Sequence, residues 1–341
     1  MENTPDARRA AHRHSQAGNP VHYESKGELD RMPCFLAIDV GGTKADYALV
    51  NEDRTLARVR SGSIKRMRVD AQTATDNLEA ALRELTAQSG IDLRTVVRTC
   101  VGTAGQTVPL VTDWLHAEIP LRVGGDLLVL GDVEIALDAA FPGQPGILAL
   151  AGTGSNVAGR TPRGDIFTAG GWGPVLSDQG SGHRIGVQAL RALCLARDGG
   201  TSTDLLPAIL GFWKLGSFYD LVAFANASPP PDFSQLVKVV VQCADRGDRV
   251  AQAVLEQQGG ELADLVCLLI PRIQQSVDDS SFMPGLAFAG SIMEKVHRVR
   301  QSLIDAVHEH YPAVIAMAGV VDPLQGAIWH AKTGAGFERV E

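Results

Sequence analysis

CFLAIDVGGTKADYALV, residues 34–50, and GILALAGTGSNVAGR, residues 146–160, decide the fold, because both follow one pattern. Each begins with an apolar run that is typical of a buried strand, continues through a turn with two glycines, and returns in a second strand. A third strand is predicted after each hairpin, at TLARVRSG and at DIFTAGG. The repeated strand, glycine turn, strand, strand unit predicts two related lobes that face a cleft.

The rest of the chain alternates between helical and strand patterns, which predicts an α/β protein. The long stretch from about residue 179 to 273 is predicted to be largely helical. The other predicted elements are a helix at 71–88, strands at TVVRTCVG and DLLVLGD, a helix at VEIALDAAF, strands at GLAFAG and AVIAMAG, and a last helix at 323–332.

Length and composition narrow the classes of protein and partner. A chain of 341 residues is too long for one typical core, and 45% hydrophobic residues can bury a sizeable one in each of two lobes. The net charge of −8 and the 5% aromatic content argue against nucleic acid, whose binding domains usually present a basic surface. No apolar run reaches the roughly 18 to 20 residues that cross a bilayer, so no membrane partner is predicted.

The predicted domain organisation has three parts. Residues 1–32 are polar and are expected to be a flexible N-terminal extension. Residues 33–142 form the expected N-terminal lobe, which a C-terminal helix at about 324–340 rejoins, and residues 143–323 form the C-terminal lobe. Five cysteines, an odd number without a CxxC pair, indicate reduced thiols in a cytoplasmic protein.

The first glycine turn has the composition of a phosphate-binding loop. Gly41 and Gly42 let the backbone approach a ligand, so that amides converge on an oxyanion. Thr43 adds a hydroxyl donor, and Lys44 either supplies a charge or points to solvent. Asp39, at the end of the preceding strand, is a candidate Mg²⁺ ligand through water. The alternative is a simple hairpin turn.

The second glycine turn repeats this logic with Gly152, Thr153, Gly154, Ser155 and Asn156. It is not a Walker A loop, since no GK[ST] follows, and it lacks the third glycine of the dinucleotide fingerprint. Two such hairpins, one in each lobe, are more specific than either alone. Together they predict a clamp that holds one polyphosphate from both sides.

Asp132 follows the apolar strand DLLVL and precedes a helical segment. A carboxylate at the carboxyl end of a strand is a candidate general base for an alcohol nucleophile. Beyond such a carboxylate, phosphoryl transfer needs little from the protein except the positioning of both substrates and Mg²⁺. The alternative role is an N-cap, which Asp performs well, and the two roles are compatible.

A glycine-rich loop at residues 170–181 is the fourth candidate feature. Trp172 stands among four glycines, one of which is Gly171, and has the character of a side chain that stacks on a sugar face. Asp178 would accept hydrogen bonds from sugar hydroxyls. The alternative is a linker with a buried Trp.

Taken together, these motifs resemble the N-acetylglucosamine kinase family, which belongs with the BadF/BadG/BcrA/BcrD ATPases in the sugar kinase, Hsp70 and actin superfamily. The resemblance covers roughly residues 34–332 and is strongest at 131–190, where GD, AGTGSN, GGWG and SDQGSG come in the family's order. It implies a two-lobed actin-like ATPase fold of the ribonuclease H-like kind, with a central cleft.

The resemblance also implies residue roles, with ATP and Mg²⁺ as cofactors. Asp132 would be the catalytic base, and Thr43 and Thr153 would touch the ATP phosphates. The other implied roles are ATP binding by Gly41, Gly42, Lys44, Gly152, Gly154, Gly247 and Gly290, and sugar binding by Ser155, Asn156, Gly171, Trp172 and Asp178.

Two departures from the family pattern concern the sugar. Members that use N-acetylglucosamine carry an Asn shortly after the third strand, where this chain reads SGSIKRMRVD. The sugar loop reads Asp178-Gln179 where the family has Asp-Glu. These changes keep the kinase class and leave the N-acetyl preference open.

The predicted activity is therefore ATP-dependent phosphorylation of a hydroxyl on an amino sugar or hexose, with N-acetylglucosamine or glucosamine favoured. One alternative is an ATPase that activates a partner enzyme through iron–sulfur ligands. The other is a sugar sensor that does not catalyse. The resemblance is also compatible with a homodimer.

Overall fold

The computed structural model describes residues 32–336, so the predicted extension at 1–32 lies, except for Met32, outside the described residues. Its N-terminal part contains a five-stranded sheet of order β3-β2-β1-β4-β5, in which β2 runs antiparallel to β1 and β3 while β4 runs parallel to β1 and β5. The strands are β1 (Cys34–Val40), β2 (Lys44–Val50), β3 (Thr55–Gly62), β4 (Val96–Thr103) and β5 (Asp126–Leu130).

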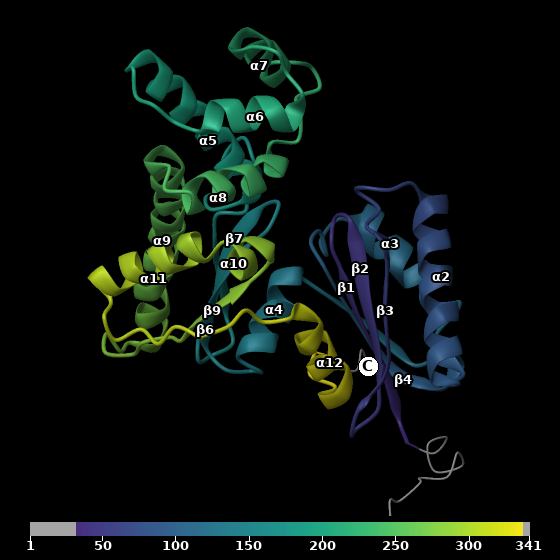
Figure 1. Ribbon diagram of the computed structural model, residues 1–341. Helices are drawn as coiled ribbons and strands as arrows, with labels where there is room; N and C mark the ends of the chain where they lie inside the picture. Colours follow the sequence, from purple (N-terminus) through teal and green to yellow (C-terminus); the bar gives the residue numbers. More distant parts are fainter. Residues whose placement is uncertain (1–31, 337–341) are drawn as a thin grey trace, which may run out of the picture. The chain divides into compact units, whose positions relative to one another are not determined.

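Strand β1 shows how this sheet divides its side chains between two faces, because successive residues of a strand point in opposite directions. Leu36 and Ile38 pack with α2 (Ala71–Ser89) and α3 (Pro109–Glu118). Phe35 and Ala37 pack on the other face with α4 (Asp132–Ala140) and α12 (Pro323–Thr333). The sheet is thus covered on both faces, as Figure 1 shows for α2 and α12.

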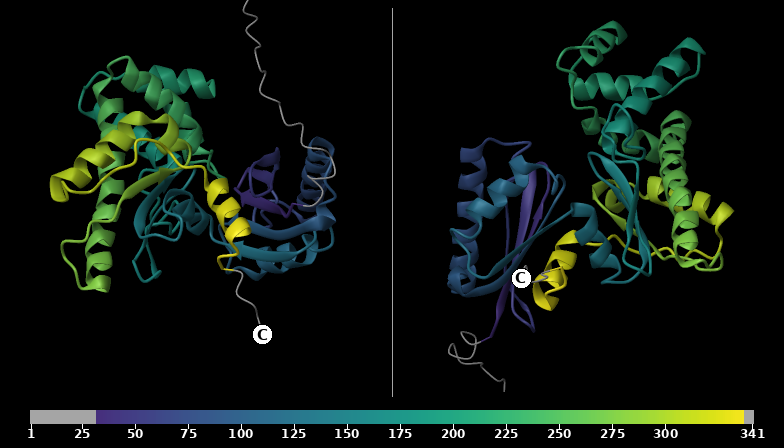
Figure 2. Two further views of the ribbon diagram at one scale, coloured as in Figure 1. Left: turned by 90° about the horizontal axis from the view of Figure 1, so that it is seen from below. Right: turned by 180° about the vertical axis from the view of Figure 1, so that it is seen from behind.

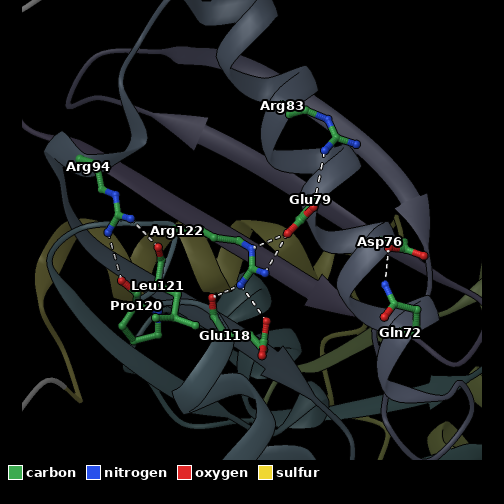
Figure 3. A network of polar contacts seen from close by, with 9 residues as sticks. All are labelled: Gln72, Asp76, Glu79, Arg83, Arg94, Glu118, Pro120, Leu121 and Arg122. Carbon is green, nitrogen blue, oxygen red and sulfur yellow. Dashed lines mark hydrogen bonds and ion pairs between the residues drawn. The ribbon is translucent and has the colours of Figure 1, made fainter.

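An ion-pair network fixes the helices on the outer face (Figure 3). Arg122 pairs with Glu79 of α2 at 2.9 Å and with Glu118 at the end of α3 at 2.7 Å. Arg94, in the short helix η1 (Leu93–Thr95), donates to the carbonyls of Pro120 and Leu121. These contacts join α2 to the connection that leads into β5, and β5 ends next to Asp132.

The C-terminal part repeats the plan with a four-stranded sheet of order β8-β7-β6-β9. Ile147 and Ala149 of β6 pack with the helices that follow, while Leu148 packs with Leu137 of α4. The right-hand view of Figure 2 shows the teal α4 and the yellow α12 side by side between this sheet and the N-terminal one. The elements are β6 (Gly146–Ala151), β7 (Ser155–Arg160), β8 (Ile166–Ala169), α5 (Gly182–Asp198), α6 (Leu205–Trp213), α7 (Phe218–Ala225), η2 (Phe233–Leu236), α8 (Val237–Asp245), α9 (Arg249–Val277), β9 (Leu286–Ala289), α10 (Ser291–Lys295) and α11 (His297–His310).

In the described residues, no single helix has the length and apolar character to cross a membrane. Among the described residues, only α6 and α7 taken together reach that length and apolar character, and these two helices are bent by 64° relative to each other.

The predicted strand AVIAMAG (313–319) is wrong, because in the described residues it pairs with β9 only at an isolated bridge of Ala316 with Leu286. The chain pairs with β9 again just beyond it, at a bridge of Val321 with Ala289. Between these bridges β9 advances by three residues while the edge segment advances by five. The two extra residues bulge out of the ladder around Gly319, which ends regular pairing.

Helices α4 and α12 pack against each other and join the two sheets, since α12 contacts β1 and β4 and α4 contacts β6 and β7. A buried polar group at this junction links both helices to β7. Nη2 of Arg160 donates to Asp138 Oδ2 at 2.7 Å, and Nε2 of His330 lies 2.8 Å from the same oxygen. Helix α12 ends at Thr333, before the predicted residue of about 340, because Gly334 takes a left-handed conformation and caps it; residues 337–340 lie outside the described range.

Candidate active site

The first glycine turn is a tight hairpin in which the Gly41 amide donates to the Lys44 carbonyl at 2.9 Å. Ser63 donates through Oγ to the Gly41 carbonyl at 2.7 Å and holds the turn against the end of β3. Gly42 and Thr43 are exposed, and Lys44 reaches back to Asp46 at 3.4 Å. The turn therefore presents its tip to a ligand from a fixed base, and its contact with phosphate stays a prediction.

Asp39 lies among several carboxylates at the end of β1. Its pKa is raised to about 7, first by burial and then by the negative charges of Asp132, Asp46 and Asp322, against a lowering by Lys44. The concentration of negative charge indicates that this place is suited to a cation.

The donor set fits Mg²⁺ held together with a nucleotide. In residues 32–336, no group of three or more His, Cys, Asp or Glu side chains is close enough to form a complete metal site. Mg²⁺ typically binds through one or two carboxylates, water and the phosphates of its substrate. Asp39 supplies such a carboxylate, and the first glycine turn begins immediately after the same strand.

Asp132 is the first residue of α4, at the end of β5, and it is half-buried. Gly131 is the N-cap, so the alternative role of Asp132 as N-cap is wrong. Its Oδ1 accepts from the Val133 amide at 2.9 Å. Burial raises the pKa of Asp132, while the charge of Lys65 and the Val133 amide lower it. A carboxylate with a raised pKa is better matched to accepting a proton near neutral pH.

The second glycine turn is braced against the start of α5. The carbonyls of Gly152 and Thr153 accept from the amides of Gly182 and His183, and Oγ of Ser155 donates to the Gln179 carbonyl at 2.6 Å. The turn and the loop before α5 therefore form one unit, although 24 residues separate Ser155 from Gln179.

The glycine-rich loop needs left-handed backbone at several positions, including Asp178 with a φ of 68°. This brings Asp178 beside the second turn, since a Cβ on Gly154 would lie 3.2 Å from Asp178 Oδ2. Burial raises the pKa of Asp178, and the Ser155 amide lowers it. Two predicted sugar-binding positions, Ser155 and Asp178, thus come together with Gly154, which is predicted to bind ATP.

Asn156 and Gly171 also meet, because a Cβ on Gly171 would lie 2.9 Å from the Asn156 side chain. The Oδ1 atom of Asn156 is buried and has no hydrogen-bond partner among the described residues. An unpartnered buried acceptor is costly unless a ligand or water donates to it. This atom is therefore a candidate acceptor for a sugar hydroxyl.

Trp172 differs from these residues because its side chain is 73% exposed, so it is not the buried Trp of the linker alternative. It lines a depression of about 440 Å³ together with Leu176, Gln179, Leu265 and other residues. Its stacking on a sugar stays a prediction.

The two predicted adenosine-side glycines differ in position. Gly290 follows β9 with a φ of 92°, and a Cβ there would lie 2.4 Å from the Ala151 carbonyl oxygen, at the second turn. Gly247 lies in the turn between α8 and α9, and no described atom lies within 4 Å of the Cβ position. The structure thus brings Gly290, but not Gly247, into contact with the second turn.

Two residues near Asp39 and Asp132 were missed by sequence reasoning. Asp322, the N-cap of α12, contributes to the charge around Asp39 and pairs with Arg58 of β3 at 2.7 Å. The sequence feature that could have identified Asp322 is the DPLQGA segment, which follows an apolar run of strand-like character. Lys65 contributes to the charge around Asp132, and its only signal was the basic stretch that stands in place of the family's Asn.

Two sheets that share the order third-second-first-fourth strand, with a fifth strand added in the N-terminal one, and that are each opened by a glycine hairpin, define the class of two-lobed actin-like ATPases. The family model of the BadF/BadG/BcrA/BcrD ATPase family matches residues 36–331, and the chain belongs to this family.

Named relatives and solved structures agree with this assignment. An N-acetylmuramic acid/N-acetylglucosamine kinase of Clostridium acetobutylicum is 26% identical over 89% of this chain and 99% of its own length. An N-acetyl-D-glucosamine kinase of Dictyostelium discoideum is 26% identical over 86% of this chain and 96% of its own. A Chromobacterium violaceum structure that bears a provisional N-acetylglucosamine kinase name superposes with a TM-score of 0.66, at 26% identity, over 87% of this chain and 98% of that one.

Proposed function

We propose that this protein is an ATP-dependent kinase that transfers the γ-phosphate to a hydroxyl of an amino sugar, with N-acetylglucosamine or glucosamine as the favoured acceptors. The observation that carries the proposal is the half-buried Asp132 at the end of β5, with Asp39 close enough for the two charges to interact. Family membership and relatives named as sugar kinases support the same activity.

In the proposed reaction, Asp132 accepts the proton of the acceptor hydroxyl as the hydroxyl oxygen attacks the γ-phosphorus, and the bond from that phosphorus to the bridging oxygen breaks so that ADP leaves. The amides of the turns at Gly41–Gly42 and Gly152–Thr153 orient the phosphates. Asp39 would hold Mg²⁺, which neutralises the charge that develops on the phosphate oxygens when it is bound.

The acceptor would bind on the side of the second turn, between Asn156 and Asp178. Asn156 Oδ1 has no partner among the described residues, and Asp178 is 6% exposed beside Gly154. These two acceptors would fix hydroxyl groups of the sugar. Trp172 is proposed to cover the sugar face, and a homodimer is proposed from the resemblance alone.

A sugar panel with ATP and Mg²⁺, read both by ADP release and by phosphosugar formation, tests this proposal. The expected result is ADP release that depends on an amino sugar, with one phosphosugar formed for each ADP. Sugar-independent hydrolysis that rises with a partner protein would favour the activator alternative, and the absence of ATP consumption with either addition would favour the non-catalytic sugar sensor.

A further inference from the structure

A tight turn at residues 178–181 links the glycine-rich loop to α5. The Ser181 amide donates to the Asp178 carbonyl at 3.0 Å and closes this turn. Gly180 is the third residue of the turn and has a φ of 76°, the left-handed backbone that a type II turn requires at this position. The orientation of the central peptide group, between Gln179 and Gly180, therefore decides the form of the turn.

Two side chains from distant elements hold this one peptide group at both of its ends. Ser155 of β7 donates through Oγ to the Gln179 carbonyl at 2.6 Å. The Gly180 amide donates to Oε1 of Gln258, in α9, at 3.1 Å. The peptide group is thus fixed between the second glycine turn and α9.

Helix α9 is itself held firmly at this place. A Cβ on Gly180 would lie 3.0 Å from Cδ2 of Leu262, so the turn packs directly on the helix. A Cβ on Gly259, the residue after Gln258, would lie 2.4 Å from the Val299 carbonyl oxygen of α11. The close packing of α9 on α11 therefore fixes the position from which Gln258 reaches the turn.

The hydrogen bonds of Gln258 show which of its atoms the turn uses. Its side chain is fully buried, and its Nε2 has no hydrogen-bond partner among the described residues. A buried donor without a partner is costly, and a methionine of similar size would avoid that cost. Because the Gly180 amide can only donate, it needs an acceptor such as Oε1. Gln258 therefore contributes at this position through its oxygen.

We propose that Gln258 is a positioning residue for the acceptor sugar, because the peptide group that it fixes sets the relative placement of Ser155 and Asp178. The proposal rests on the proposed kinase function and deepens it by adding a residue that touches neither substrate. Without Oε1, the central peptide of the turn can rotate toward the type I form, in which the third residue has a negative φ. Its carbonyl then leaves Ser155, and the two proposed sugar-binding residues lose their fixed arrangement.

Gln258→Met tests this role, because methionine fills a similar space and offers only a weak acceptor in place of Oε1. We expect KM for the amino sugar that the wild-type enzyme uses to rise by about tenfold, which corresponds to about 1.4 kcal/mol, while KM for ATP stays within about twofold. The thermal unfolding midpoint should change little. The variant loses the unpartnered Nε2 and leaves the Gly180 amide without a strong acceptor, so one unsatisfied group replaces another.

Two further variants serve as controls. Gln258→Glu keeps an oxygen at the same place and should keep KM for the sugar close to the wild-type value. Gln257→Met makes the same exchange at the neighbouring, exposed residue, whose side chain donates to Glu261 at 2.7 Å. This variant should leave both KM values unchanged.

A double-mutant cycle with Ser155→Ala separates positioning from a general loss of packing. Both side chains hold the same peptide group, so either substitution frees it, and the second should add little to the rise in KM for the sugar. Calorimetric titration of the same variants with N-acetylglucosamine and glucosamine, in the absence of ATP, gives the dissociation constants without relying on turnover.

The positioning role is overturned if Gln258→Met binds the sugar as tightly as wild type, or if the effects of Gln258→Met and Ser155→Ala multiply. A lower unfolding midpoint with unchanged sugar binding would give Gln258 a structural role alone. If the wild-type protein binds an amino sugar and forms no phosphosugar, the kinase function fails, while the dissociation constants still decide the role of Gln258. If it binds neither sugar, both proposals fail.

Discussion

Charged side chains of the proposed site come from segments that are distant in the sequence, and this distance decided which of them could be predicted. Asp39 and Asp132 end apolar strands, so the sequence pattern identified them. Lys65 and Asp322 approach them only through the packing of a turn and a helix N-terminus, which no spacing rule describes. Local patterns therefore predicted the residues at strand ends and missed those that tertiary packing adds.

One methyl group added at Gly154 tests whether Asp178 belongs to the sugar site. A Cβ at this position would lie 3.2 Å from Asp178 Oδ2, and the backbone does not need the left-handed region. Gly154→Ala should therefore displace the Asp178 carboxylate and raise KM for the sugar several-fold, with stability changed by about 1 kcal/mol or less. Steady-state kinetics measures KM, and urea unfolding measures the change in stability.

Gly211→Ala is the matched control, because no described atom lies within 4 Å of its Cβ position in α6. It should leave KM unchanged and stabilise the protein by about 0.5 to 1 kcal/mol through the better helix propensity of Ala. An unchanged KM in Gly154→Ala would remove Asp178 from the sugar site.

At the level of elements, the apolar runs, the alternation of side chains along each strand and the glycine turns of the hairpins predicted the strands of both sheets. The alternation in β1 separates Leu36 from Phe35, and these residues pack with different helices. The edge segment after α11 was mispredicted because its apolar run reads as a strand, whereas its register on β9 includes two extra residues. Such a bulge depends on the partner strand and has no signal in the run itself.

The contact between α4 and α12 supports Asp132 and can be tested at Gly326. A Cβ on Gly326 would lie 1.7 Å from the carbonyl oxygen of Ile135, so the two helices must separate in Gly326→Ala. We expect a loss of about 1 to 3 kcal/mol or more in the free energy of unfolding. Because α4 begins with Asp132, kcat should fall as well.

Gly260→Ala in α9 is the control for this change, since no described atom lies within 4 Å of its Cβ position. Urea unfolding and steady-state rates compare the two variants. Equal stability in both variants would contradict the close packing of α4 on α12.

For the whole molecule, the repeated hairpin predicted two lobes, and the two sheets have the matching strand orders. How the lobes are joined was not predicted, because Asp138, Arg160 and His330 meet from three elements that lie up to 192 residues apart. Burial alone raises the pKa of Asp138, but the hydrogen bonds from His330 and Arg160 outweigh it and lower the pKa to about 2.

The Asp138 junction predicts a pH-dependent contribution to stability. The folded pKa of about 2 lies below the unfolded value of 3.8, so the contribution is full above pH 4 and is lost as pH falls toward 2. Asp138→Asn leaves Arg160 without its buried counter-charge and should cost about 3 to 5 kcal/mol at pH 7. The difference from wild type should shrink by about 1 kcal/mol between pH 5 and pH 3.

Urea unfolding of both proteins across this pH range measures the difference. A stability gap that stays constant from pH 5 to pH 3 would show that Asp138 does not hold its charge through these contacts. Asp113→Asn, at an exposed site on α3 with no ion pair among the described residues, provides the comparison for removing a carboxylate elsewhere.

The central claim is that Asp132 accepts the proton of a sugar hydroxyl, and the turnover of Asp132→Asn tests it most directly. The asparagine keeps the size of the side chain but cannot take up a proton, so phosphosugar formation should fall by about 10²- to 10⁴-fold while ATP binding persists. Phosphosugar formation by Asp132→Asn at close to the wild-type rate would contradict the claim.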